Sequence, residues 1–169
     1  TGSPALWAIA AGFVLVTIFR YFDMARFARA NIAPTDVEAA AHWEIRVTFS
    51  SGMFAFLCGA WCFASAVFAS DPFALTISLV VTVSCMVGIV TRNFGLDRLL
   101  TIQLLIALSL MAGGLILGGG GYHWFLAFVM LIILVSYRKL AADVRAVLLN
   151  AVHSRVEASR LAIELDTAM

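Results

Sequence analysis

The densest group of side chains capable of chemistry is the segment His42-Trp43-Glu44-Ile45-Arg46, directly before a long apolar stretch. Together with three charges that follow an earlier apolar stretch, it forms what we call the inner-edge cluster: Arg20, Asp23, Arg26, His42, Trp43, Glu44 and Arg46. At a membrane surface, Trp43 would anchor the chain, Arg46 would meet phosphate head groups and Glu44 would pair locally. The alternative interpretation is a charge network that couples a change in the membrane to an adjoining helix.

Three cysteines are the next candidates, because thiolates bind soft metal ions and take part in redox chemistry. Cys58 and Cys62 are four residues apart, so they share one helix face, and Cys85 lies in a neighbouring apolar stretch. Free cysteine commonly packs as a small apolar residue. We therefore expect packing residues here, rather than a disulfide framework, a metal site or a redox site.

The histidines do not converge on one site. His42 lies at the expected inner membrane surface, before the second apolar stretch, and His123 lies at the outer end of the fifth stretch. His153 lies in the polar tail. Because haem and metal ions need ligands at matching depth, we expect no metal and no cofactor. The sequence also has no phosphate loop, nucleophile elbow, paired carboxylates or zinc-ligand spacing, so we expect no catalytic site and no enzyme activity in this chain.

Apolar helices must position these residues. Apolar residues make up 63% of the chain and charged residues 12%, against about 45–50% and about 25% in soluble domains. A hydrocarbon core about 30 Å thick requires about 20 helical residues, and backbone groups in lipid must bond internally. Five apolar stretches follow one another: residues 4–19, 47–69, 73–91, 99–118 and 122–137. The sequence predicts an all-α membrane protein, an up-down bundle of five transmembrane helices.

The basic residues predict the orientation of this bundle. All eleven Lys and Arg residues belong to the first connection, the third connection or the tail: Arg20, Arg26, Arg29, Arg46, Arg92, Arg98, Arg138, Lys139, Arg145, Arg155 and Arg160. The second and fourth connections contain none. Because basic loops remain in the cytoplasm, we expect residue 1 outside and residue 169 in the cytoplasm.

The beginning of the chain lacks the features of a signal peptide. The first residue is not Met, and the first apolar stretch has no basic segment before it. An outside N-terminus without a signal requires an earlier segment. We therefore expect a fragment of a longer protein, with a further crossing before Thr1 and six crossings in total.

Helix-start signals subdivide the connections. Thr35 and Glu38 have the spacing of a capping box, so a helix is expected to begin there. With the basic stretch at residues 23–30, this predicts one or two amphipathic helices between the first and second spans. Asp71 and Pro72 are expected to cap and start the third helix. The four glycines at residues 118–121 are expected to form the turn between the fourth and fifth helices.

Polar side chains are rare inside the spans. Gln103 is the only amide, and His123 near an outer end is the only ionisable group. Intramembrane ionisable groups commonly mark ion pathways, so their scarcity weighs against a transporter or a proton pump. Ser51, Ala55 and Gly59 recur every four residues, which predicts a small-residue face for close helix contact.

The tail has the pattern of a coiled coil. No Pro or Gly occurs between Tyr122 and Met169, so the fifth helix is expected to continue through the tail. Eight positions follow one another at the spacing 4-3-4-3-4-3-4, and all but Ser154 are apolar. The seven apolar residues form what we call the tail seam: Leu140, Val144, Val147, Ala151, Ala158, Leu161 and Leu165. We expect a transmembrane domain at residues 1–137 and a cytoplasmic heptad helix at 138–169 that pairs as a parallel homodimer.

This tail resembles the exit from membrane sensor regions of bacterial cyclic di-GMP signalling proteins. The resemblance rests on Ser136-Tyr137-Arg138-Lys139-Leu140, the heptad helix, and the closing Glu164-Leu165-Asp166-Thr167-Ala168-Met169. In many alphaproteobacterial members, a similar Leu-Asp-x-Ala-(Leu/Met) opens a PAS domain, followed by GGDEF and often EAL domains. The Trp43-Glu44-x-Arg46 segment and the Gly- and Phe-rich span after it are similar to an inner crossing of these regions. Related regions precede histidine kinases.

The resemblance implies a membrane-embedded sensory, anchoring and dimerising module of the bacterial inner membrane. It would transmit a signal to a downstream cytoplasmic enzyme of the same chain, and no catalytic residue is carried over to this sequence. The expected partners are the lipid bilayer, a second copy and the downstream domains, with no nucleic acid. The alternative is a transporter- or channel-like subunit, which would leave the heptad tail without a purpose.

Overall fold

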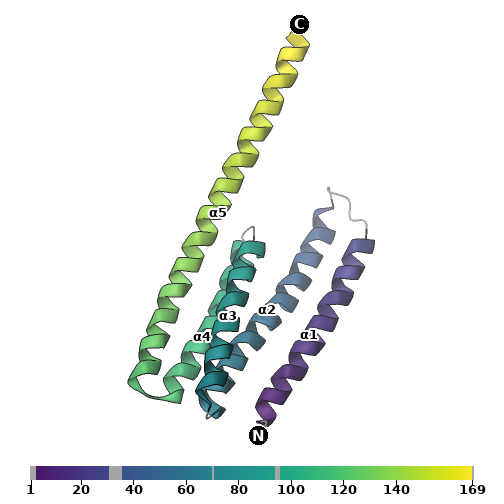
Figure 1. Ribbon diagram of the computed structural model, residues 1–169. Coiled ribbons are helices and arrows are strands. Elements are labelled where there is room, and N and C mark those ends of the chain that lie inside the picture. Colours follow the sequence, from purple (N-terminus) through teal and green to yellow (C-terminus); the bar gives the residue numbers. More distant parts are fainter. Residues whose placement is uncertain (1–2, 31–35, 70, 94–95, 169) are drawn as a thin grey trace.

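The computed structural model describes residues 3–30, 36–69, 71–93 and 96–168, with the side chains of these except Ala40, Arg92, Ser159 and residues 161–168 (Figure 1). This part of the chain forms five helices: α1 (Pro4–Arg29), α2 (Val37–Phe68), α3 (Pro72–Asn93), α4 (Asp97–Gly118) and α5 (Gly121–Ala168). Each is long and apolar enough to cross a membrane. The prediction of an all-helical chain with five helices of membrane-crossing length is confirmed.

Two predicted helix signals are seen at the α2–α3 and α4–α5 connections. The Phe73 amide donates a hydrogen bond to Asp71 Oδ1 at 2.9 Å, directly at the start of α3. Between α4 and α5, Gly119 and Gly120 have φ angles of 78° and 95°. Residues with a Cβ rarely adopt these angles, so the glycines permit a turn of two residues between long helices.

The region between the first two spans differs from the prediction. α1 continues beyond residue 19 to Arg29, and α2 already begins at Val37. The described residues therefore contain no separate amphipathic helix here, because no Pro or Gly interrupts the polar turns that continue α1 and precede the apolar part of α2. Asp36 caps α2 by accepting a hydrogen bond from the Ala39 amide at 3.0 Å, whereas Thr35 lies outside the described residues.

Helices α2 and α4 form the centre of the bundle and approach each other closely. A Cβ on Gly59 would lie 2.7 Å from the Ala107 carbonyl oxygen, and one on Gly114 would lie 2.6 Å from Phe63 Cα. The predicted face of Ser51, Ala55 and Gly59 is buried along its length, in agreement with its expected role in close helix contact. Side chains smaller than Ala are therefore required at the two glycines.

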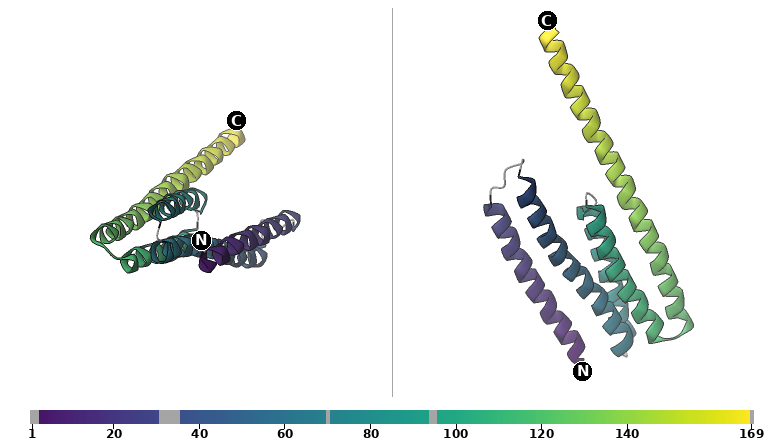
Figure 2. Two further views of the ribbon diagram at one scale, coloured as in Figure 1. Left: turned by 60° about the horizontal axis from the view of Figure 1, so that its bottom comes forward. Right: turned by 180° about the vertical axis from the view of Figure 1, so that it is seen from behind.

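The remaining helices flank this centre, as the tilted view on the left of Figure 2 shows. Among the described residues, α1 contacts α2 alone, α3 contacts α2, α4 and α5, and α5 contacts α4 and α3. Successive helices run in alternating directions in Figure 1, and α5 extends far beyond the other four. Its 48 residues correspond to about 72 Å at 1.5 Å per residue.

Candidate functional site

An ion pair joins α1 to α2 within the inner-edge cluster. Arg46 Nη2 lies 3.0 Å from Asp23 Oδ1. Asp23 lies a few residues after the apolar body of α1, and it is buried, with 6% of its surface exposed. Among the described residues, Asp23 Oδ1 has no partner with hydrogen-bond geometry. The contact with Arg46 is therefore a close approach of opposite charges without an aligned hydrogen bond.

Aromatic rings surround this ion pair. The Arg46 guanidinium lies 5.0 Å from the centroid of the Trp43 ring, a cation–π distance. The Trp43 ring in turn meets Phe27 of α1 edge-to-face, with 5.3 Å between centroids. Asp23, Phe27, Trp43 and Arg46 thus hold the polar ends of α1 and α2 together.

The other members of the inner-edge cluster lie apart from this ion pair. Arg26, His42 and Glu44 are exposed. Arg20 instead lies over Phe54, with 5.6 Å from its guanidinium carbon to the ring centroid. The structure therefore brings together three of the seven predicted residues, Asp23, Trp43 and Arg46. The exposed members are compatible with a head-group belt, and the buried pair is compatible with a charge network.

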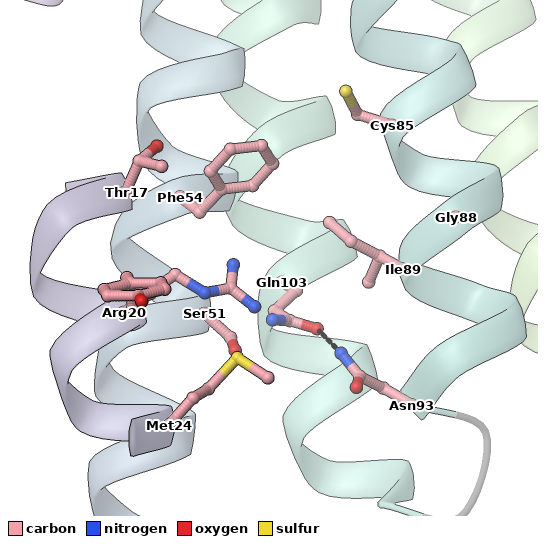
Figure 3. Close-up of a pocket in the computed structure, with 11 residues that line it drawn as sticks. Thr17, Arg20, Met24, Ser51, Phe54, Cys85, Gly88, Ile89, Asn93 and Gln103 are labelled. Carbon is pink, nitrogen blue, oxygen red and sulfur yellow. Dashed lines mark hydrogen bonds between the residues drawn. The ribbon is translucent and has the colours of Figure 1, made fainter. Parts of the chain in front are cut away.

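A cavity of about 440 Å³ lies between α1 on one side and α3 and α4 on the other. Part of α2 forms its floor (Figure 3). We call it the α1–α3 cavity, and its lining residues are Thr17, Arg20, Tyr21, Met24, Ser51, Phe54, Cys85, Gly88, Ile89, Asn93 and Gln103. Because α1 contacts neither α3 nor α4 in the described residues, these helices are separated where the cavity lies.

Gln103 of α4 is the most unusual residue of this cavity. Its side chain is completely buried, and its Oε1 accepts a hydrogen bond from Asn93 Nδ2 of α3 at 3.0 Å. Its Nε2 has no partner among the described residues. An unpaired buried donor costs about 1–3 kcal/mol. In Figure 3, the Arg20 guanidinium extends from α1 toward this amide nitrogen, so two donors converge on one place.

The cysteines lie in the packed interface between α2 and α3. Cys58 and Cys62 are buried within the apolar core, in agreement with the packing role predicted for them. Cys62 Sγ donates to Ser78 Oγ at 3.5 Å, and Thr82 Oγ1 donates to the Cys58 carbonyl at 3.2 Å. The three cysteines are free, and the described residues contain no group of three side chains placed to bind a metal ion.

Comparison with protein-family models, with curated proteins and with solved structures finds no significant match. The function of the chain is therefore inferred from its own residues and their arrangement.

The tail seam continues along α5 beyond the part of this helix that packs on the bundle. The bundle contacts of α5 include the buried residues Ala127, Met130 and Ala141. Each residue advances an α-helix by about 100°, so Val144 lies on nearly the same face as Tyr137, which packs against the core seven residues earlier. The described seam side chains are exposed in the single chain: Leu140, Val144, Val147, Ala151 and Ala158. The side chains of Leu161 and Leu165 lie outside the described part.

Sequence reasoning missed the α1–α3 cavity, of which the predicted cluster contains only Arg20. The available signal was Gln103, the only amide within an apolar span. Its hydrogen bond with Asn93 could not be predicted, because it depends on how α3 packs against α4. The same holds for Ser51, which the sequence assigned to helix packing and which also lines the cavity.

Proposed function

We propose that this chain is a membrane-embedded sensory, anchoring and dimerising module whose output is the position of α5. The observation that carries the proposal is the continuity of this helix from Gly121 to Ala168. Its first half packs against α4 and α3, and its second half extends beyond the bundle (Figure 1). One rigid element would thus connect the membrane bundle with whatever follows the tail.

The packing of the bundle offers a route from the α1–α3 cavity to this output. Gln103 and Asn93 belong to α4 and α3, and both helices contact α5. Packed helices occupy discrete arrangements, so a small change at one contact can shift a neighbouring helix. A shift of α4 at Gln103 would be passed to Ala127 and Met130, which α5 buries in the same core.

Charge supports an up-down orientation with the tail in the cytoplasm. Figure 1 places the last turns of α1 and α3, the first turns of α2 and α4 and the tail toward the same end of the bundle. Arg26 and Arg29 end α1, and Arg98 begins α4, also at this end. Because basic segments are retained in the cytoplasm, this end would face the cytoplasm of a bacterial cell, with the bundle in the inner membrane.

The output partner would be a cytoplasmic signalling domain of the same chain. The resemblance of the tail to the exit of cyclic di-GMP sensor regions supports PAS, GGDEF or EAL domains, or a histidine kinase. A parallel pair of α5 helices would set the spacing of two such domains. The tail seam supplies the apolar residues for such a pair.

An insertion series tests this function. Residues 1–169 are fused to a reporter enzyme whose activity depends on dimer geometry, and one to seven alanines are inserted after Ala158. The activity should vary with the length of the insertion and recover with seven residues, because a heptad restores the seam. Reporter activity that does not change with the length of the insertion would contradict a signalling helix. Solute flux through vesicles, combined with that indifference, would favour the transporter- or channel-like alternative.

A further inference from the structure

We propose that the α1–α3 cavity binds an amphiphile whose oxyanion head is held by the Arg20 guanidinium and the Gln103 side-chain amide. This binding site goes beyond the proposed signalling function and does not depend on it. The shared chemistry is a carboxylate or phosphodiester carried on an acyl chain, as in a fatty acid or an anionic lipid.

The head of the ligand is inferred from the two donors. Asn93 Nδ2 donates to Gln103 Oε1 at 3.0 Å, which fixes the amide so that Nε2 faces away from Asn93. This Nε2 is buried without a partner in the described residues, and Figure 3 shows it facing the Arg20 guanidinium. Two donors, one of them charged, suit an oxyanion, because guanidinium and amide N–H groups make their strongest hydrogen bonds to charged oxygens.

The body of the ligand is inferred from the rest of the lining. Met24, Phe54 and Ile89 present apolar surface in the same cavity, and Gly88 has no side chain. A volume of about 440 Å³ falls within the range of about 300–1,000 Å³ found for ligand sites. Polar donors concentrated at one place within an apolar cavity select a molecule with one polar end.

The approach of the ligand is inferred from the arrangement of α1. The backbone of this helix approaches α2 but neither α3 nor α4 in the described residues, so the cavity lies between the separated backbones of α1 and α3. An acyl chain could therefore extend from the cavity between α1 and α3 into the surrounding lipid. The head would remain near Arg20, close to the polar end of α1.

The test measures binding of radiolabelled oleate to the full chain in nanodiscs made of neutral lipid. Oleyl alcohol, which has the same chain without the charge, should compete on the order of tenfold less well. Arg20→Gln and Gln103→Met should each weaken oleate binding by a similar factor. Displacement of oleate by phosphatidylglycerol would assign the site to a lipid phosphodiester, and its failure to displace would assign it to a free carboxylate.

Two further variants separate binding from folding. Gly88→Leu should abolish binding while the helical content stays unchanged, because an added Cβ at Gly88 meets no atom within 4 Å. Arg98→Gln removes an exposed cation outside the cavity and should leave the affinity unchanged. Equal affinity for oleate and oleyl alcohol would overturn the proposal, since it would mean that the cavity does not recognise the charged head. Equal loss in Arg98→Gln would also overturn it.

Discussion

Asp23 of α1 and Arg46 of α2 form an unequal ion pair, in which the carboxylate is almost completely buried and the guanidinium is about one-third exposed. The two atoms lie 3.0 Å apart, with side-chain exposures of 7% for Asp23 and 31% for Arg46. A buried carboxylate depends on its partner, because removing one member of such a pair leaves an uncompensated charge. Since α1 contacts only α2 among the described helices, this pair helps to determine whether α1 stays on the bundle.

We expect Arg46→Gln to destabilise the protein by about 3 kcal/mol, at the lower end of the range for broken buried pairs because Arg46 is partly exposed. The loss should be measurable as a lower free energy of unfolding in mixed detergent micelles. The double variant with Asp23→Asn should recover much of it, because the buried charge is then also removed. Glu44→Gln, an exposed change on the same helix, is the matched control. A double variant as unstable as Arg46→Gln would show that the pair is not the cause.

The close contact of α2 with α4 predicts opposite effects at two adjacent glycines. Gly114→Ala should destabilise by about 1–3 kcal/mol, because the new Cβ would meet Phe63 Cα at 2.6 Å. Gly113→Ala has no atom within 4 Å of its new Cβ and should be neutral, or stabilising by up to about 1 kcal/mol through helix propensity. Unfolding of both variants under identical conditions checks this. Equal effects at the two positions would argue against the close helix contact.

The helical class of this chain was predictable because it follows from local properties. Apolar length fixed the number of membrane-crossing helices, and Asp71, Pro72 and the glycines near 119 marked their ends. The apolar spans alone do not give the extents of α1 and α2, because a change from apolar to polar residues marks the edge of the apolar core without stopping a helix. The helix ends instead follow from the cap at Asp36 and from the connection between α1 and α2.

The site was predictable only in part. Arg46 and Asp23 were recognised as charges near the ends of neighbouring spans, and their proximity follows from the short connection between α1 and α2. The contact between Gln103 and Asn93 was not recognised, because residues on different helices meet according to helix rotation, which a sequence with nearly uniform apolar spans does not specify. For the same reason, the cavity that they line with Arg20 appeared only in the structure.

The orientation of the bundle predicts which cysteines a membrane-impermeant thiol reagent can reach. In a variant in which Ala replaces the three native cysteines, Tyr122→Cys should react from outside intact cells. Arg145→Cys should react only after the membrane is opened. Both positions are exposed in the structure, so a difference reports the side of the membrane and not burial. Reaction of Arg145→Cys from outside, with Tyr122→Cys protected, would reverse the orientation.

Cysteine crosslinking in native membranes tests whether α5 carries the output as a parallel pair along the tail seam. In the same cysteine-free background, Val147→Cys lies on the seam and Arg145→Cys lies off it, and both side chains are exposed in the single chain. Parallel pairing along the seam brings the two Val147 positions together. We therefore expect efficient disulfide-linked dimers at position 147 under mild oxidation and few at 145. Efficient crosslinking at 145 but not at 147, or crosslinking at neither, would contradict this pairing.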